Sequence, residues 1–79
     1  MKIMKRINNY LIDKEYKIIV KDNQVSIINY NEILDFTLEK ISIRHNNKII
    51  IIEGKNLYIS KMLEDEVLIK GIITIIRIN

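Results

Sequence analysis

Short runs of apolar residues alternate with polar residues along the chain from residue 16 onward. The polar stretches between the runs contain Asn, Asp, Gly and charged residues, which favour turns and loops. This arrangement is typical of short β-strands joined by tight connections. The pattern predicts about seven to eight strands, at residues 16–20, 25–28, 32–38, 40–44, 48–53, 57–61, 66–70 and 72–78.

The alternation within two of these segments predicts which side chains face the interior. Residues 40–44 read polar, apolar, polar, apolar, polar, which places Ile41 and Ile43 on one face of a strand. In the segment at 57–61, the same rule buries Leu57 and Ile59 and points Tyr58 outward.

Two clusters of polar residues mark turns between apolar runs. Asp22-Asn23 predicts a hairpin turn, because both residues tolerate a positive φ. His45-Asn46-Asn47 predicts a second turn, with the His45 side chain in solvent. The chain has no Cys and no second His, so a zinc site at His45 would need carboxylates for its other ligands.

Two segments, residues 49–52 and 72–76, are apolar at almost every position. A strand with two apolar faces is either central in its sheet or covered by another subunit or a helix. We therefore expect these strands to provide a contact surface for a partner or for a second copy. The residues predicted for this surface are Ile50, Ile52, Ile73 and Ile75.

The only two glycines stand in similar local sequences, 17 residues apart. Each follows the end of an apolar segment and precedes a new one. Because glycine adopts a positive φ and lets another backbone approach closely, both are predicted to have a structural role at a turn or a bulge. We interpret the repeat as two similar two-strand units and assign Gly54 and Gly71 as structural turns.

The composition agrees with a small all-β domain. Ile accounts for 21 of the 79 residues, and β-branched side chains favour strands over helices. The apolar share of 48% is too high for an unfolded chain, and the absence of Cys excludes disulfides. We expect one antiparallel sheet or a sandwich, with a short N-terminal helix as an open question.

The net charge of +3 comes from the first part of the chain, because residues 18–79 contain as many acidic as basic side chains. We divide the sequence into a basic N-terminal segment, residues 1–15, and an all-β domain, residues 16–79. Apolar residues in the segment have helical spacing but no clear cap, so a helix and an irregular terminus both stay open. The candidate membrane contact is formed by Lys2, Lys5 and Arg6.

We find no arrangement of residues that predicts catalysis, a cofactor or a metal ion. Ser26, Ser42 and Ser60 all lie in predicted strands, without the strand–turn–helix setting of a nucleophile. The acidic cluster at residues 64–66 lacks the spacing and the glycine of a calcium-binding loop. No apolar segment has the length of a signal peptide or a membrane span, so we expect a cytoplasmic protein.

A small barrel that binds single-stranded nucleic acid is the alternative function. Such barrels use exposed aromatic side chains beside basic ones, and Tyr58 is predicted to point outward near Lys55 and Lys61. The neutral body of the chain argues against this partner, because nucleic-acid binding depends on clustered positive charge.

Four short motifs occur in a fixed order along the domain. They are Val25-x-Ile27-Ile28-Asn29-Tyr30-x-x-Ile33-x-x-Phe36, Ile41-x-Ile43, Ile50-x-Ile52-x-Gly54-x-Asn56-Leu57-x-Ile59 and Ile69-x-Gly71-x-Ile73-x-x-Ile76. In their order and spacing, over about residues 16–78, the chain resembles the YabP/YqfC family of sporulation proteins, and the YqfC branch in particular.

The resemblance implies a non-enzymatic protein of the mother cell in an endospore-forming bacterium. It implies a role in formation of the spore envelope, as a structural or interaction module, and no catalytic or cofactor-binding residues. A YqfD-like, membrane-anchored sporulation protein is the implied partner, which would bring the chain to a membrane as a peripheral protein. Association with a second copy is a further expectation, and nucleic acid is not.

Overall fold

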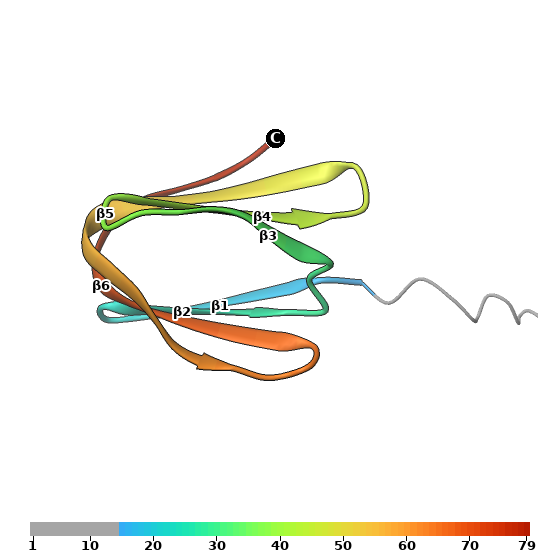
Figure 1. Cartoon of the computed structure of the whole chain (residues 1–79), viewed down its shortest axis with the longest axis horizontal. Helices are drawn as coiled ribbons and strands as arrows, with labels where there is room; N and C mark the ends of the chain where they lie inside the picture. Colours follow the sequence, from blue (N-terminus) through green and yellow to red (C-terminus); the bar gives the residue numbers. More distant parts are fainter. Residues whose placement is uncertain (1–14) are drawn as a thin grey trace, which may run out of the picture.

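Six antiparallel strands form one sheet in the computed structural model, which describes residues 15–79 (Figure 1). The order across the sheet is β1-β2-β6-β5-β4-β3. The described part of the chain contains no helix, so the all-β prediction is confirmed. The strands are β1 (Lys17–Lys21), β2 (Gln24–Ile28), β3 (Glu32–Phe36), β4 (Lys40–His45), β5 (Lys48–Met62) and β6 (Glu66–Ile78).

Eight predicted strands become six, because two pairs of them are continuous. The predicted segments at 48–53 and 57–61 are the two ends of β5, and those at 66–70 and 72–78 are the two ends of β6. Interruptions in the apolar pattern do not end these strands, because β-bulges carry the ladder across them.

The long hairpin of β5 and β6 bends in its middle, so the single sheet folds into two facing layers (Figure 1). The first layer contains β1, β2, residues 66–70 of β6 and residues 58–62 of β5. The second layer contains β3, β4 and the other ends of the two long strands. Each layer is therefore a short hairpin added to one end of the same two-stranded ribbon.

Bulges on both long strands produce the bend. Thr74 is an extra residue of β6, because Glu53 pairs with Ile75 and the next residue of β5 pairs with Ile73. On β5, Asn56 and Leu57 together oppose the single residue Gly71 of β6. Asn56 has a φ of 54°. Bulges increase the local twist of a ribbon, which turns the strands from one layer into the other.

Both glycines lie inside the long strands at this bend, so their assignment as turns is wrong, whereas the alternative of a bulge with close backbone approach is confirmed. A Cβ atom on Gly54 would lie 1.9 Å from the carbonyl oxygen of Ile72. Gly71 has a φ of 137°, and a Cβ there would lie 2.7 Å from the carbonyl oxygen of Asn56. The two backbones approach too closely for any side chain, which is the role that glycine fills in a strand.

The glycines also mark where the tips of the short hairpins meet the ribbon. The Gly71 N–H donates to the carbonyl of Asn23, in the turn between β1 and β2, over 3.2 Å. The Gly54 N–H donates to the carbonyl of Glu39, in the turn between β3 and β4, over 3.1 Å. The repeat seen in the sequence is thus a repeat in space, with one glycine for each layer.

Nine apolar side chains without exposed surface form the core between the layers. Both layers contribute, and the cluster is continuous. Burial of Ile41, Ile43 and Leu57 and the exposure of Tyr58 confirm the period-two predictions. The hairpin turn at Asp22-Asn23 is also confirmed, with Asn23 at a φ of 59°. The core residues are Val25, Ile27, Ile41, Ile43, Ile50, Ile52, Leu57, Val67 and Ile69.

Candidate interaction surface

Within residues 15–79, more large apolar side chains are exposed than are completely buried. In the described part of the chain, eleven of them are at least 41% exposed, compared with nine in the core. Single exposed apolar residues are normal, but groups of them mark places where proteins meet. The eleven are Ile19, Val20, Leu34, Phe36, Leu38, Tyr58, Met62, Leu63, Ile72, Ile75 and Ile78.

Two of the four residues predicted for a contact surface are in the core instead. Ile50 and Ile52 have no exposed surface, so they are unable to touch a partner. They pair with Ile43 and Ile41 of β4, on the inner face of the second layer. A uniformly apolar strand does not reveal which of its two faces points inward, because side chains simply alternate between the faces.

The other two predicted residues lie on β6, where the strand belongs to the second layer. Ile75 is 45% exposed, and it pairs with Glu53 on the outer face. Ile73 is half-buried and packs against the core. Their part in a contact stays a prediction.

This end of β6, residues 72–78, is a free edge of the sheet. Among residues 15–79 it pairs with β5 on one side and with no strand on the other, since β2 pairs only with residues 66–70. We call it the free edge of β6. It contains three side chains that are about half exposed, Ile72, Ile75 and Ile78. A free edge offers backbone N–H and C=O groups to another strand.

The most exposed large apolar side chain of the described residues is Leu38, at 64%, in the turn between β3 and β4. The turn is held firmly, because its Leu38 carbonyl accepts from the N–H of Leu57 over 2.9 Å. The Thr37 hydroxyl accepts from the N–H of Lys40 over 2.9 Å. Beside it lies Phe36, the only Phe of the chain, which is 56% exposed. We call Phe36, Thr37 and Leu38 the hairpin tip.

The hairpin tip borders a shallow groove at the bend. The groove has a volume of about 420 Å³ and is lined by residues 37–39 together with Lys55 and Asn56 of β5. Leu38 and the basic Lys55 line this groove together, and Phe36 ends the strand before it, a surface that sequence reasoning missed. The available signal was two large apolar residues on either side of Thr37, in a stretch otherwise rich in polar residues.

The outer face of the first layer is basic. Lys17 and Lys21 lie on this face of β1, and Lys61 and Lys70 lie on the same face of β5 and β6. Tyr58, which is 50% exposed, pairs with Lys70 in neighbouring strands. The strand positions on this face include one carboxylate, Glu66.

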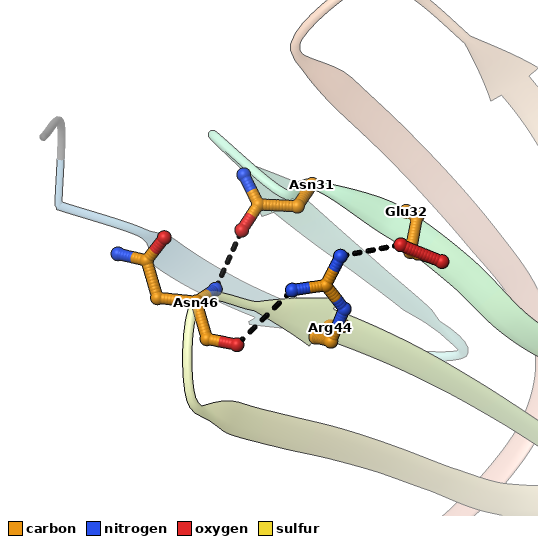
Figure 2. Close-up of polar contacts among 4 residues, drawn as sticks. All are labelled: Asn31, Glu32, Arg44 and Asn46. Atoms are coloured by element: carbon orange, nitrogen blue, oxygen red, sulfur yellow. Dashed lines mark hydrogen bonds and ion pairs between the residues drawn. The ribbon is translucent and has the colours of Figure 1, made fainter.

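The outer face of the second layer is balanced by cross-strand ion pairs. Arg77 of β6 bonds Glu53 of β5 over 2.5 Å. Arg44 of β4 forms an ion pair with Glu32 of β3, which Figure 2 shows beside the turn between β4 and β5. The charges are thus distributed unevenly between the faces. Four lysines lie on the outer face of the first layer, whereas the second carries Lys40 and the two ion pairs.

A small polar network fixes the open end of the second layer (Figure 2). Arg44 also donates to the carbonyl of Asn46 over 3.2 Å. The N–H of Asn46 donates to the side-chain oxygen of Asn31, which precedes β3. Asn46 has a φ of 53°, as the tight turn after β4 requires. These bonds join the turn between β4 and β5 to the connection that links the two layers.

His45 is buried, with 8% of its surface exposed, so its predicted position in solvent is wrong. It is the last residue of β4 and not part of the turn. Its Nδ1–H donates to the carbonyl of Asn29 over 2.8 Å, and its ring lies 5.2 Å from that of Tyr16. His45 therefore ties the end of β4 to the segment after β2, which is a structural role.

The remaining candidates do not assemble into a site. Among residues 15–79, no group of three His, Asp or Glu side chains is placed to hold a metal ion. Ser26 and Ser42 lie in β2 and β4, and Ser42 is 4% exposed. The candidate membrane contact of Lys2, Lys5 and Arg6 lies outside the described residues.

The profile of the YabP family matches residues 13–79, which is nearly the whole chain and includes all six strands. The chain belongs to the YabP family. Membership is consistent with a role related to sporulation. No curated protein and no solved structure matches the chain significantly. Within residues 15–79, no helix has the length and the apolar character needed to cross a bilayer.

Proposed function

We propose that this YabP-family protein is a non-enzymatic interaction module that acts in the mother cell during formation of the spore envelope. The observation that carries the proposal is the excess of exposed over fully buried large apolar side chains in the described residues. Exposing such side chains to water is unfavourable, and a folded domain retains many of them where partners cover them.

The hairpin tip is the contact that we assign to a partner protein. Leu38 and Phe36 are about three-fifths exposed, yet both are held in place. Phe36 ends β3 and pairs with Ile41, and the turn that carries Leu38 is fixed by backbone and Thr37 hydrogen bonds. Apolar side chains on a rigid turn lose little conformational freedom when they bind, which favours affinity. The adjacent groove adds Lys55 as a basic group for an acidic residue of the partner.

A YqfD-like, membrane-anchored sporulation protein is the partner that we propose, with the chain assigned to the YqfC branch. This partner would hold the chain at a membrane without a membrane-spanning segment in residues 15–79. The basic outer face of the first layer supports the same placement, because anionic lipid headgroups attract lysines by about 1 kcal/mol each.

The test replaces both exposed residues of the hairpin tip, with Phe36→Ser and Leu38→Ser in one chain. We expect normal folding, because neither side chain is in the core, but loss of co-purification with the YqfD-like protein and far fewer heat-resistant spores. Asp35→Ser, on the same hairpin, is the control and should change neither readout. Normal spore counts and normal co-purification in the folded double variant would refute the proposal.

Binding of single-stranded nucleic acid is a second candidate, favoured by one observation. Tyr58 is half exposed opposite Lys70, on the face that also carries Lys61. An exposed aromatic ring beside lysines is the arrangement on which bases stack. Salt-sensitive retention on a single-stranded DNA column, lost with Tyr58→Ala and Lys61→Ala together, is the expected result for this function. No retention at low salt excludes it.

A further inference from the structure

Apolar side chains on the free edge of β6 are more exposed than the residues of β5 with which they pair. Ile78 pairs with Ile50 on the inner face, yet Ile78 is 47% exposed and Ile50 is not exposed at all. On the outer face, Ile75 is 45% exposed next to the half-buried Glu53. The second layer therefore buries the inner side chains of β5 but leaves the side chains at the free edge of β6 exposed.

The free edge of β6 also lacks the features that protect sheet edges from association. Bulges and charged side chains are the usual protection. β1 carries Lys17 and Lys21 at its two ends. β3 has a bulge between Ile33 and Asp35, and the free end of β5 has one at Ser60.

On β6 the bulge at Thr74 comes early, and the ladder from Ile75 to Ile78 is regular. The only charge in this regular part is Arg77, which is already paired with Glu53 of the same chain. The free edge of β6 is thus the least protected of the edges that the structure describes.

We propose that the free edge of β6 pairs with the same edge of a second copy. Two identical strands related by a two-fold axis run antiparallel, and this is the most common symmetry of protein dimers. With the axis at Ile76, Arg77 of one copy lies opposite Ile75 of the other, so no like charges face each other. The pairing joins the two second layers into one continuous sheet and covers Ile75 and Ile78.

Charge favours this edge over β1, which carries a lysine at each of its ends. In an antiparallel pair of two β1 strands centred on Ile19, Lys17 of each copy lies opposite Lys21 of the other. Like charges directly opposite each other destabilise a sheet. An acidic strand is not the preferred partner of the free edge of β6. The only basic residue of this edge is Arg77, and Arg77 is already paired with Glu53 of the same chain.

This inference adds a second contact to the proposed function and is separate from the hairpin tip. A chain that stays monomeric but still co-purifies with the YqfD-like protein refutes the dimer and leaves the proposed function standing. A chain that forms the dimer, but whose hairpin-tip variant still co-purifies with the YqfD-like protein and still supports spore formation, refutes the proposed function and leaves the dimer standing.

The test is Ile75→Lys, measured by light scattering over a dilution series of the full chain. Inside one copy the new lysine faces Glu53, so the fold should persist, but across the dimer it faces Arg77. Opposed like charges cost several kcal/mol, so we expect the dissociation constant to rise about a hundredfold or more. The wild type should give twice the chain mass of 9.4 kDa.

The matched control is Ile19→Lys, on the edge strand β1. Ile19 is 44% exposed and Ile75 is 45% exposed, so the same substitution changes a residue of equal exposure. We expect this control to leave the dimer unchanged. A wild-type chain that is monomeric at every concentration, or a dimer that survives Ile75→Lys, overturns the inference.

A second measurement depends on position and not on charge. The chain has no Cys, so Ile75→Cys introduces a single thiol. A short bis-maleimide should link two copies through Cys at this position, because the two sites lie within about 8 Å in the proposed pair. Ile19→Cys should remain unlinked, and equal linking of both variants would contradict pairing at β6.

Discussion

The two layers of the molecule have the same construction but different surfaces. Each is a short hairpin laid against one end of the β5–β6 ribbon, and in each a glycine N–H of the ribbon bonds the hairpin's turn. The first layer carries lysines on its outer face, whereas the second carries two cross-strand ion pairs. The difference shows that the inner faces are set by the shared core, while the outer faces are free to differ.

The glycines at the bend should give the largest effect, because both layers depend on them. Gly54→Ala places a Cβ 1.9 Å from a backbone oxygen, and Gly71→Ala adds a side chain at a positive φ. We expect each change to cost more than about 3 kcal/mol of unfolding free energy, measured by urea denaturation with circular dichroism.

Lys55→Ala is the control for the bend, because Lys55 is exposed and lies beside Gly54. It should change the unfolding free energy by less than about 0.5 kcal/mol. A folded Gly54→Ala chain with the midpoint of the wild type would mean that one layer bends without its glycine. The two layers would then differ in their need for a glycine at the bend.

Core substitutions come next and test whether the layers depend equally on the shared interior. Ile27→Ala removes side-chain atoms from the first layer, and Ile41→Ala removes the same atoms from the second. Both residues have no exposed surface, so we expect similar losses of about 3 kcal/mol. Urea denaturation should show one cooperative transition in both variants. Two separate transitions in either would show that the layers unfold independently.

The surface charges should give the smallest effect and should separate the layers. Glu53→Gln breaks the ion pair with Arg77. The Glu53 side chain is 30% exposed and that of Arg77 is 53% exposed, so solvent screens most of the energy of the pair. We expect a loss of about 0.5 kcal/mol that fades as salt is added. Lys70→Gln on the first layer should cause no loss. An equal, salt-dependent loss in both variants would show that the two faces are electrostatically alike.

Alternation along the sequence was sufficient to place most strands and part of the core. Ile41, Ile43 and Leu57 are buried as their period-two pattern predicts, because polar neighbours mark the opposite face. Where the neighbours are also Ile, the pattern says only that both faces are apolar. For this reason Ile50 and Ile52 were assigned to the wrong face.

Features that depend on distant contacts were beyond sequence reasoning. The Gly54 and Gly71 repeat indicated a shared geometry, but the merging of strands follows from bulges in a ladder between residues far apart. His45 looked like part of a polar turn, and its burial depends on the carbonyl of Asn29 and the ring of Tyr16. The hairpin tip is held by the N–H of Leu57, which donates to the Leu38 carbonyl from another strand, and the sequence pattern contains no sign of this contact.

The place of β6 in the sheet has a consequence for the order in which the protein folds. The hairpins β1–β2 and β3–β4 are local and close within microseconds in typical peptides. β2, however, finds its second neighbour only in β6, which follows all other strands in the chain. During synthesis, Val25 and Ile27 therefore lack their cross-strand neighbours in β6 until Val67 and Ile69 have left the ribosome. A chain truncated before β6 should be a target for chaperones and proteases, since β2 then lacks one of its two neighbours and the ribbon that joins the layers does not form.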